Sequence, residues 1–385
     1  MTKQAGTVVD AGAPSVWIPI VALGIGAGCV SALQPVLLEL LRQAGRLDVG
    51  TMGLAATCEA AGMTLASAVA ALFFPLRNLR RIALVAIAGM MAANGGTMLA
   101  SGLGIVALRL LNGLGSGTLL WIMVGLFARS PQPGRIFAIY VTAQSIVALA
   151  LSQAMTALVV PYVGYRGGNG LLVLLNVAML GAVAMMVNAF DDRREAGRGL
   201  PGIHGIAALL AMSCFLAGIM ALWVYMLPVL GALGYDAAVM AKAVPLAIAS
   251  QIAGGLAATV LAPRLRPDLA WALGAVGMLL ATALIMGGAG AVAMLSGAAL
   301  LGFVWIFVPP FQMPVILRIE PGGRGAMLVG TAQLVGTAIG PLAASPVVSA
   351  QGPLAAWHVS AAWIVASLVL LAFAATGNRA VRTAV

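Results

Sequence analysis

The sequence predicts an all-α integral membrane protein in which twelve transmembrane helices form two pseudo-symmetric six-helix bundles. Of its 385 residues, 62% are hydrophobic and only 8% are charged, whereas about a quarter of the residues of a soluble domain are charged. The apolar residues fall into runs long enough to cross a bilayer, and the basic residues fall between the runs. Because a soluble fold of this length could not bury so much apolar surface, part of that surface must face lipid.

Each predicted span follows from the same length rule. A helix needs about 20 mostly apolar residues to cross the hydrocarbon core. The breaks after the third and ninth spans are marked only by short Gly-rich sequence, which favours turns. The predicted spans are residues 16–41, 50–76, 82–101, 104–128, 136–160, 168–190, 204–230, 237–262, 269–288, 290–317, 325–350 and 354–376.

The basic residues set the orientation. If both termini are cytoplasmic, that side collects fifteen Lys and Arg residues and the opposite side collects only Arg42, Arg46 and Arg166. Short loops with an excess of Lys and Arg remain on the cytoplasmic side. The remaining two, Arg109 and Lys242, lie inside predicted spans. We therefore expect a bacterial inner-membrane (plasma-membrane) protein with both termini in the cytoplasm.

The two halves repeat each other around a polar linker. The predicted domains are residues 1–190 and 204–385, and the linker is residues 191–203. Short motifs recur at offsets close to 189 residues, which indicates a parallel six-plus-six repeat with a substrate site between the halves near the midplane. The matches pair Thr142-Ala143-Gln144 with Thr331-Ala332-Gln333, Asp48 with Asp236, Pro35-Val36-Leu37 with Pro228-Val229-Leu230, and Trp121-Ile122 with Trp305-Ile306.

The fourth span carries the sharpest motif, Arg109-Leu110-Leu111-Asn112-Gly113-Leu114-Gly115-Ser116-Gly117. This motif and the six-plus-six repeat resemble the major facilitator superfamily. The resemblance implies alternating-access transport by a monomer and a role for Arg109 in proton coupling. The basic loop Arg77, Arg80 and Arg81 is similar to the gating loop of that family, but Leu76 and Leu79 replace its Asp and Gly.

The antiporter motif of the family is also displaced. Its Gly-Pro sequence is absent from the fifth span, where Leu151-Ser152 occupies the place. A version appears on the eleventh span, as Gly336-Thr337-Ala338-Ile339-Gly340-Pro341. The direction of transport therefore does not follow from the motifs.

Charged side chains inside the spans are functional candidates, because each costs roughly 2.5–3.5 kcal/mol to insert. Glu59 lies about 15 Å into the second span, and we expect it to carry the coupling proton with Arg109 as its partner. Burial and a nearby arginine act in opposite directions on a carboxyl group's proton affinity. The alternative is a static ion pair that fixes helix packing. Glu39, near the outer end of the first span, is a further coupling candidate or an interfacial residue.

A second group of residues is predicted to bind substrate. Lys242 either meets an anionic substrate group or extends to the outer surface. Amides donate and accept hydrogen bonds without charge, and they serve either a ligand site or helix–helix contacts. The aromatic residues would form cavity walls. The candidates are Lys242, Gln144, Gln333, Gln34, Asn112, Tyr225 and Trp305.

These observations favour a secondary active transporter of a small organic solute, an organic anion or an amphipathic drug-like compound, driven by the proton gradient without a cofactor or bound metal. A lipophilic-cation drug/proton antiporter is the alternative within transport. A sensor or assembly factor on a transporter scaffold is the alternative outside it. The chain has no HExxH, paired-Asp or Walker sequence, so we expect neither an enzyme nor an ATPase. Its expected partners are the solute, protons and membrane lipids, with no nucleic acid, because the net charge of +10 is spread over short loops.

Overall fold

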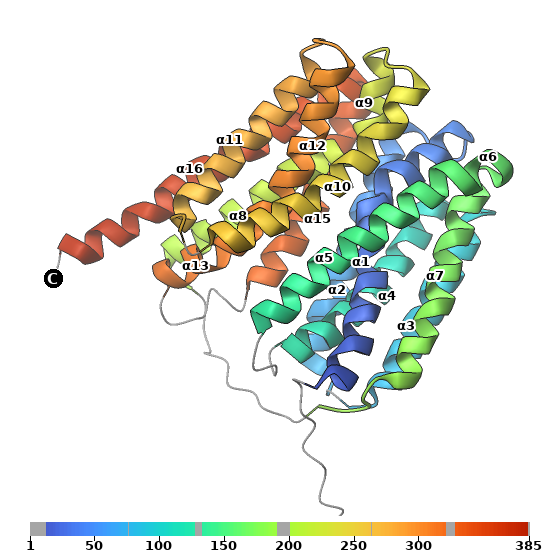
Figure 1. The fold of residues 1–385 in the computed structure, drawn as a ribbon, viewed down its shortest axis with the longest axis horizontal. Helices are drawn as coiled ribbons and strands as arrows, with labels where there is room; N and C mark the ends of the chain where they lie inside the picture. Colours follow the sequence, from blue (N-terminus) through green and yellow to red (C-terminus); the bar gives the residue numbers. More distant parts are fainter. Residues whose placement is uncertain are drawn as a thin grey trace, which may run out of the picture.

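A computed structural model describes residues 13–75, 77–127, 133–190, 201–262, 264–320 and 328–383 of the chain. Residues 191–200 of the predicted linker lie outside these ranges. The chain folds into long helices that form two bundles, one from the first half of the sequence and one from the second (Figure 1). The long helix α16 extends from the second bundle toward the C-terminus.

The first bundle contains six spans, of which the fifth is continued by a π-helical turn (η1) and the short helix α6. Within it, α2 packs on α4, α3 lies between α4 and α7, and α1 contacts α4, α5 and α7. The elements are α1 (Pro14–Gln43), α2 (Val49–Phe73), α3 (Leu79–Thr97), α4 (Leu103–Phe127), α5 (Pro133–Gln153), η1 (Ala154–Val159), α6 (Val160–Val163) and α7 (Tyr165–Met185).

The second bundle also contains six spans, of which two are broken. Helix α8 packs on α15 and α16, and α12 packs on α10 and α11. The elements are α8 (Ile203–Trp223), α9 (Met226–Ala232), α10 (Ala237–Leu261), α11 (Pro267–Met286), α12 (Ala291–Phe307), α13 (Pro309–Ile319), α15 (Val329–Gln351), η2 (Pro353–Ala355) and α16 (Ala356–Thr383).

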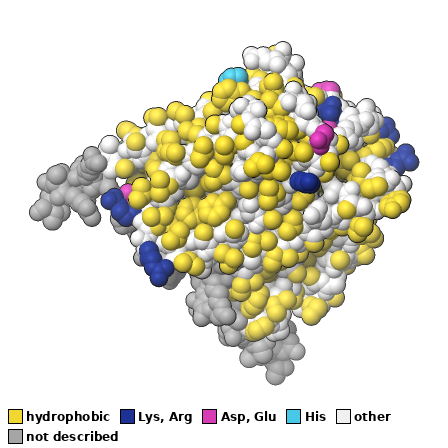
Figure 2. All heavy atoms as spheres, turned by 45° about the horizontal axis from the view of Figure 1, so that its top comes forward, with side chains coloured by type: hydrophobic (Ala, Val, Ile, Leu, Met, Phe, Trp, Pro, Cys, Tyr) yellow, Lys and Arg dark blue, Asp and Glu magenta, His cyan; other side chains and the backbone are white. Residues whose placement is uncertain are grey.

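Each of the twelve predicted spans has a helical counterpart, so the predicted fold class is confirmed. Ten helices within the described ranges are long and apolar enough to cross a membrane, and the pair α12–α13 adds an eleventh. Helix α3 is the twelfth by its place between α4 and α7. Large apolar side chains such as Leu99, Leu174 and Val292 are exposed on the surface, and apolar side chains cover much of the face in Figure 2. The chain is an integral membrane protein.

Proline explains the two breaks that the length rule did not predict. Helix α12 bends by 40° into α13 beside Pro309 and Pro310, and α8 is interrupted at Tyr225, shortly before Pro228. A proline ring collides with the carbonyl of the residue four positions earlier and donates no hydrogen bond, so the helix cannot continue straight. The sixth span also ends earlier than predicted, because Met186 adopts an extended backbone.

The repeat is visible in helix caps and helix crossings. Asp48 caps α2 through the Thr51 N–H at 2.9 Å, and Asp236 caps α10 through the Val239 N–H at 2.8 Å. A Cβ added to Gly113 would collide with the Glu59 carbonyl, and one added to Gly302 would collide with the Ala247 carbonyl. Glycine allows this close approach of helix backbones in lipid. The two crossings are therefore equivalent.

This register corrects one part of the repeat. Ala247 follows Glu59 by 188 residues and Gly302 follows Gly113 by 189 residues. The Trp121 and Trp305 pair is separated by only 184 residues, so the two tryptophans differ by about one helical turn from equivalent positions.

The halves meet through the middle of their helices and through the ends that carry Asp48 and Asp236, the predicted outer side. Helix α2 packs along α15, and α5 packs along α10. Four hydrogen bonds join described residues of the two halves. They are Ser345 Oγ to the Gly50 carbonyl at 2.8 Å, Thr57 Oγ1 to the Ala338 carbonyl at 3.3 Å, Trp223 Nε1 to the Ser31 carbonyl at 3.1 Å, and Ser145 Oγ to Gln251 Oε1 at 3.4 Å.

Candidate functional site

A connected group of buried polar side chains lies in the middle of the first bundle. It joins five helices, α1, α2, α3, α4 and α7, and every member is almost fully shielded from solvent. Buried polar groups in lipid require internal partners, because no water is available to satisfy them. We call this group the Glu59 network. It consists of Gln34, Glu59, Asn94, Thr97, Arg109, Asn112 and Asn169.

The two oxygens of the Glu59 carboxylate have different surroundings. Oε1 accepts a hydrogen bond from Asn112 Nδ2 and lies 3.8 Å from an Arg109 Nη1. Oε2 accepts a hydrogen bond from Gln34 Nε2 at 3.3 Å. Glu59 and Arg109 are each only 2% exposed. The carboxylate therefore has donors on both oxygens and a cation on one side.

The guanidinium of Arg109 is held on its other side by neutral oxygens. Its Nη2 donates to Asn94 Oδ1 at 3.0 Å, to Thr97 Oγ1 at 3.2 Å and to Asn169 Oδ1 at 3.4 Å. Asn94 Nδ2 in turn donates to Asn112 Oδ1 at 3.0 Å. The donors thus run in one direction, from Arg109 through Asn94 and Asn112 to the Glu59 carboxylate. This order suits an ionised carboxylate, which accepts hydrogen bonds and donates none.

Three members of the network were missed by sequence reasoning. Asn94 and Thr97 lie on α3, and Asn169 lies near the start of α7. Each is an isolated polar residue in apolar sequence, and isolated polar residues in membrane helices commonly make helix–helix hydrogen bonds. That signal was available, but the partner was not, because Asn169 is 60 residues from Arg109 along the chain.

The second bundle has no equivalent network. Its crossing of α10 and α12 repeats that of α2 and α4, but Ala247 occupies the place of Glu59. At the same register Ala298 and Leu301 replace Arg109 and Asn112, and all three are buried apolar residues. The same helix crossing therefore forms without charge, so the Glu59 network is not a requirement of the fold.

The predicted ligand glutamines lie in two different settings. Gln144 on α5 donates weakly to the Gly28 carbonyl at 3.5 Å, and its Oε1 is buried without a hydrogen-bond partner. Gln333 on α15 is partly exposed. Gln34 and Asn112 belong to the Glu59 network instead. Sequence reasoning also missed Gln251, which is buried on α10 and joins the halves through Ser145.

The predicted aromatic residues lie at the contact between the halves. Tyr225 is fully buried at the break after α8, and a Cβ added to Gly53 of α2 would collide with its hydroxyl group. Trp305 packs edge-on against Trp223, with their ring centroids 5.3 Å apart. Trp223 also donates to the Ser31 carbonyl of α1. These rings form part of the seam that closes the predicted outer side.

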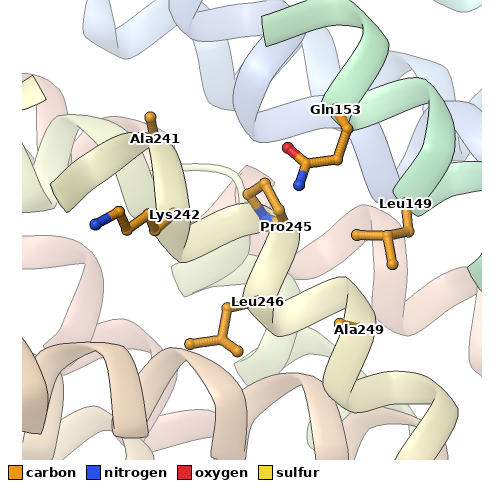
Figure 3. Close-up of a pocket in the computed structure, with 7 residues that line it drawn as sticks. All are labelled: Leu149, Gln153, Ala241, Lys242, Pro245, Leu246 and Ala249. Carbon is orange, nitrogen blue, oxygen red and sulfur yellow. The ribbon is translucent and has the colours of Figure 1, made fainter. Parts of the chain in front are cut away.

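Lys242 lies outside the Glu59 network, on the exposed surface of α10. It borders a pocket of about 310 Å³ between α5 and α10, lined also by Leu149, Gln153, Ala241, Pro245, Leu246 and Ala249. In Figure 3 its amine points away from Gln153. This placement is compatible with a side chain that extends toward the membrane surface.

The remaining predicted residues make contacts close to their own helices. Glu39 accepts hydrogen bonds from Arg42 at 2.7 and 2.8 Å and from Gln43 at 2.9 Å. Arg80 Nε donates to the Met186 carbonyl at 2.7 Å, and Arg77 forms an isolated backbone bridge with Ala189. Arg81 is exposed. The basic loop is therefore tied to the end of α7 in its own half. No group of three or more His, Cys, Asp and Glu within the described ranges could hold a metal ion.

The fold and the site together define a polytopic α-helical membrane protein with a charged network in one of two related bundles. No protein-family model matches the chain, and no curated protein matches it in sequence. Among solved structures it is similar to a crystal structure of a single-substitution mutant of the nucleoside transporter NupG, with a TM-score of 0.70. The match covers 94% of this chain and 99% of that chain at 11% sequence identity. At this identity the likeness establishes the fold.

Proposed function

We propose that the protein is a proton-coupled secondary transporter of a small organic solute that works by alternating access. The observation that carries this proposal is the asymmetry between two otherwise equivalent helix crossings. The first holds the Glu59–Arg109 pair and the second holds Ala247 and Ala298. Since a buried charge pair costs desolvation that apolar residues avoid, its presence in one half alone supports a functional role.

Glu59 is the proposed proton carrier. Its carboxylate lies about 15 Å from the start of α2, near the middle of the bilayer. Arg109 is the proposed partner that favours the ionised state, and movement of Arg109 away from the carboxylate would favour protonation. Glu39 remains a secondary candidate, and its pairing with Arg42 on the same helix favours a structural role.

The solute site is proposed to lie between the bundles, near Gln144, Gln251 and Trp305. Uncharged amides and an aromatic ring suit a solute that is recognised by hydrogen bonds and stacking. A nucleoside has this chemistry, and the structural neighbour is by its title a nucleoside transporter. Organic anions and lipophilic cations are the other classes to compare, with Lys242 as the proposed contact for an anion.

A ligand screen tests the solute class. A ligand at a hundredfold excess over its Kd stabilises the folded state by about 2.7 kcal/mol, so thermal unfolding of purified protein reports binding. We would compare uridine and adenosine, a set of organic anions and a set of lipophilic cations. Stabilisation by anions that is lost in Lys242→Ala would mark an organic-anion carrier. Stabilisation by cations that is lost in Glu59→Gln would mark a drug/proton antiporter.

Flux in proteoliposomes tests transport and coupling separately. With a ligand from the screen, wild-type protein is expected to accumulate it when a pH gradient is applied, and Glu59→Gln is expected to retain exchange without gradient-driven accumulation. Gradient-driven accumulation by Glu59→Gln would refute the role of Glu59. Binding without any flux in the wild type would instead favour a sensor on a transporter scaffold.

A further inference from the structure

Gln34 is the member of the Glu59 network whose hydrogen bonding is incomplete. Its Nε2 donates to Glu59 Oε2 at 3.3 Å, but its Oε1 is buried with no hydrogen-bond partner. The side chain is only 3% exposed. An amide has one donor end and one acceptor end, and a buried acceptor without a partner carries a free-energy cost. Gln34 therefore has an unused acceptor next to the proposed proton site.

Chemistry restricts where a proton can bind on Glu59. Oε1 is already approached by Asn112 Nδ2 and by the Arg109 guanidinium, which are both donors. A proton on Oε1 would direct a third donor at them. Oε2 has only the Gln34 amide as a hydrogen-bond partner among the described residues. One proton from water would thus form an O–H bond at Oε2, and the carboxylate would become a neutral acid.

A protonated Oε2 needs an acceptor, and only one of its amide neighbours is able to provide one. Asn112 is fixed, because its Oδ1 accepts a hydrogen bond from Asn94 Nδ2 while its Nδ2 serves Glu59. Gln34 is free to turn, since its Oε1 gives up no partner. Rotation of the amide by half a turn would place Oε1 against Oε2 and would exchange the direction of the hydrogen bond.

The position of Gln34 links this change to the contact between the halves. Ser31 lies three residues earlier on α1, one turn away on the same face, and its carbonyl accepts the hydrogen bond of Trp223 Nε1 from the second half at 3.1 Å. The described arrangement, in which Gln34 donates to an ionised carboxylate, is accompanied by a closed seam between α2 and α15.

We propose that Gln34 is a positioning residue that senses the protonation state of Glu59 by reversing its amide and transmits that state through α1 to the seam between the halves. This inference rests on the proposed function, because it assumes that Glu59 carries the coupling proton. It assigns Gln34 to coupling in place of the substrate contact expected from sequence.

Few other ionisable groups face this site. Helix α15 has no ionisable residue between Val329 and Gln351, and Arg109 is the single ionisable residue of α4. Helix α1 carries Glu39 and Arg42, which pair with each other, and Cys29. On α2 itself Cys58 is adjacent to Glu59. Tyr225 faces Gly53, more than a turn away from Glu59.

The experiment measures the proton and the seam in the same protein. Infrared difference spectra recorded over a pH titration in lipid report the carboxylic acid C=O band of Glu59, which must be absent in Glu59→Gln. A disulfide between Gly50→Cys and Ser349→Cys reports closure of the seam, because a Cβ on Gly50 would meet Ser349 Oγ. For this readout the native Cys29, Cys58 and Cys214 are replaced by alanine.

In the wild-type background we expect the band to appear as the pH falls and cross-linking to decline with the same midpoint. In Gln34→Met the band should persist but shift to higher wavenumber, because its acceptor is lost, and cross-linking should lose its dependence on pH. Gln312→Met is the matched control. Gln312 is also a buried glutamine with an unpartnered amide nitrogen, but it lies on α13 of the other half. It should behave as the wild type.

An unshifted band together with an unchanged pH dependence in Gln34→Met would overturn the inference. If Gln34→Met does not fold, as judged from thermal unfolding, Gln34→Asn serves as the second variant. Its amide is one methylene shorter and is withdrawn from the carboxylate, so the same loss is expected. If cross-linking still follows pH in Glu59→Gln, the proposed coupling role of Glu59 itself fails, whatever Gln34 does.

Discussion

The Glu59 carboxylate and the Arg109 guanidinium lie 3.8 Å apart inside the first bundle, and each side chain is 2% exposed. Their charges cancel, but neither has access to water. Removal of one partner leaves the other as an uncompensated charge in a membrane helix bundle. The pair thus makes both the stability and the activity of the protein sensitive to a single substitution.

Arg109→Gln is expected to destabilise the protein by about 3–5 kcal/mol, the usual cost of breaking a buried ion pair from one side. Glu59→Gln combined with Arg109→Gln should recover most of that loss, because no unpaired charge remains. Reversible denaturant unfolding in detergent measures both. Arg266→Gln is the control, since Arg266 pairs with Asp268 on the exposed surface and such pairs contribute about 1 kcal/mol or less. A double variant no more stable than Arg109→Gln would contradict the charge argument.

Gly113→Ala is expected to cost about 1–3 kcal/mol, because the new methyl group would collide with the Glu59 carbonyl and force α2 and α4 apart. Gly302→Ala should cost a similar amount at the equivalent crossing, where it meets the Ala247 carbonyl. Thermal unfolding in detergent compares the two. Gly181→Ala on α7 is the control, because a Cβ there meets nothing within 4 Å, and better helix propensity should stabilise it by up to about 1 kcal/mol. Unequal costs at Gly113 and Gly302 would argue against equivalent crossings.

Asp48 gives a pH-dependent contribution to stability. Hydrogen bonds from the Thr51 N–H, and then from its hydroxyl, hold the pKa of Asp48 below its ordinary value of 3.8. A lowered folded pKa means that the contribution is fully present above the unfolded pKa and is lost as the pH falls through the folded pKa. Asp48→Ala should cost about 0.5–2 kcal/mol at neutral pH, the usual value of a helix cap.

Asp48→Asn separates the cap from its charge. Asparagine accepts the same backbone hydrogen bond but does not titrate, so this variant should keep most of the stability and lose the pH-dependent part. Unfolding midpoints measured from neutral pH to about pH 3 give both quantities, because this range crosses the ordinary pKa of aspartate. An equal pH dependence in Asp48→Asn and the wild type would assign the effect to another group.

Trp223→Phe should loosen the contact between the halves. The ring can still pack against Trp305, but the hydrogen bond to the Ser31 carbonyl is lost. A hydrogen bond contributes about 0.5–1.5 kcal/mol, so the population with an open seam should rise about two- to twelvefold. The modification rate of Gly50→Cys by a maleimide added from outside measures this population. Trp271→Phe is the control, because the Trp271 Nε1 is buried without a partner. Equal rates in both variants would contradict the role of this hydrogen bond.

Much of the fold follows from local sequence. Apolar length located the twelve spans, and Asp48 and Asp236 marked the starts of α2 and α10 by their capping chemistry. Helix ends and breaks were less well predicted, because a window of hydropathy does not register that Pro228 or Pro309 interrupts a span without ending it.

The candidate site was predicted only in part. Depth along a helix placed Glu59 and Arg109 near each other in the membrane, since both positions can be counted from the helix ends. The repeat paired the wrong tryptophans, because short matches in apolar sequence tolerate a shift of one helical turn. Neither approach indicated that Gln34 and Asn112 would contact Glu59 instead of a cavity.

By itself the sequence determined the composition, the spans, the charge asymmetry of the loops and the small number of charges inside the membrane. The tertiary structure decided which polar side chains meet. Asn94, Arg109 and Asn169 are brought together by the packing of three helices, and no periodicity within one helix records that packing. The physical reason is that a buried polar group must find a hydrogen-bond partner, but the identity of the partner depends on how the helices cross.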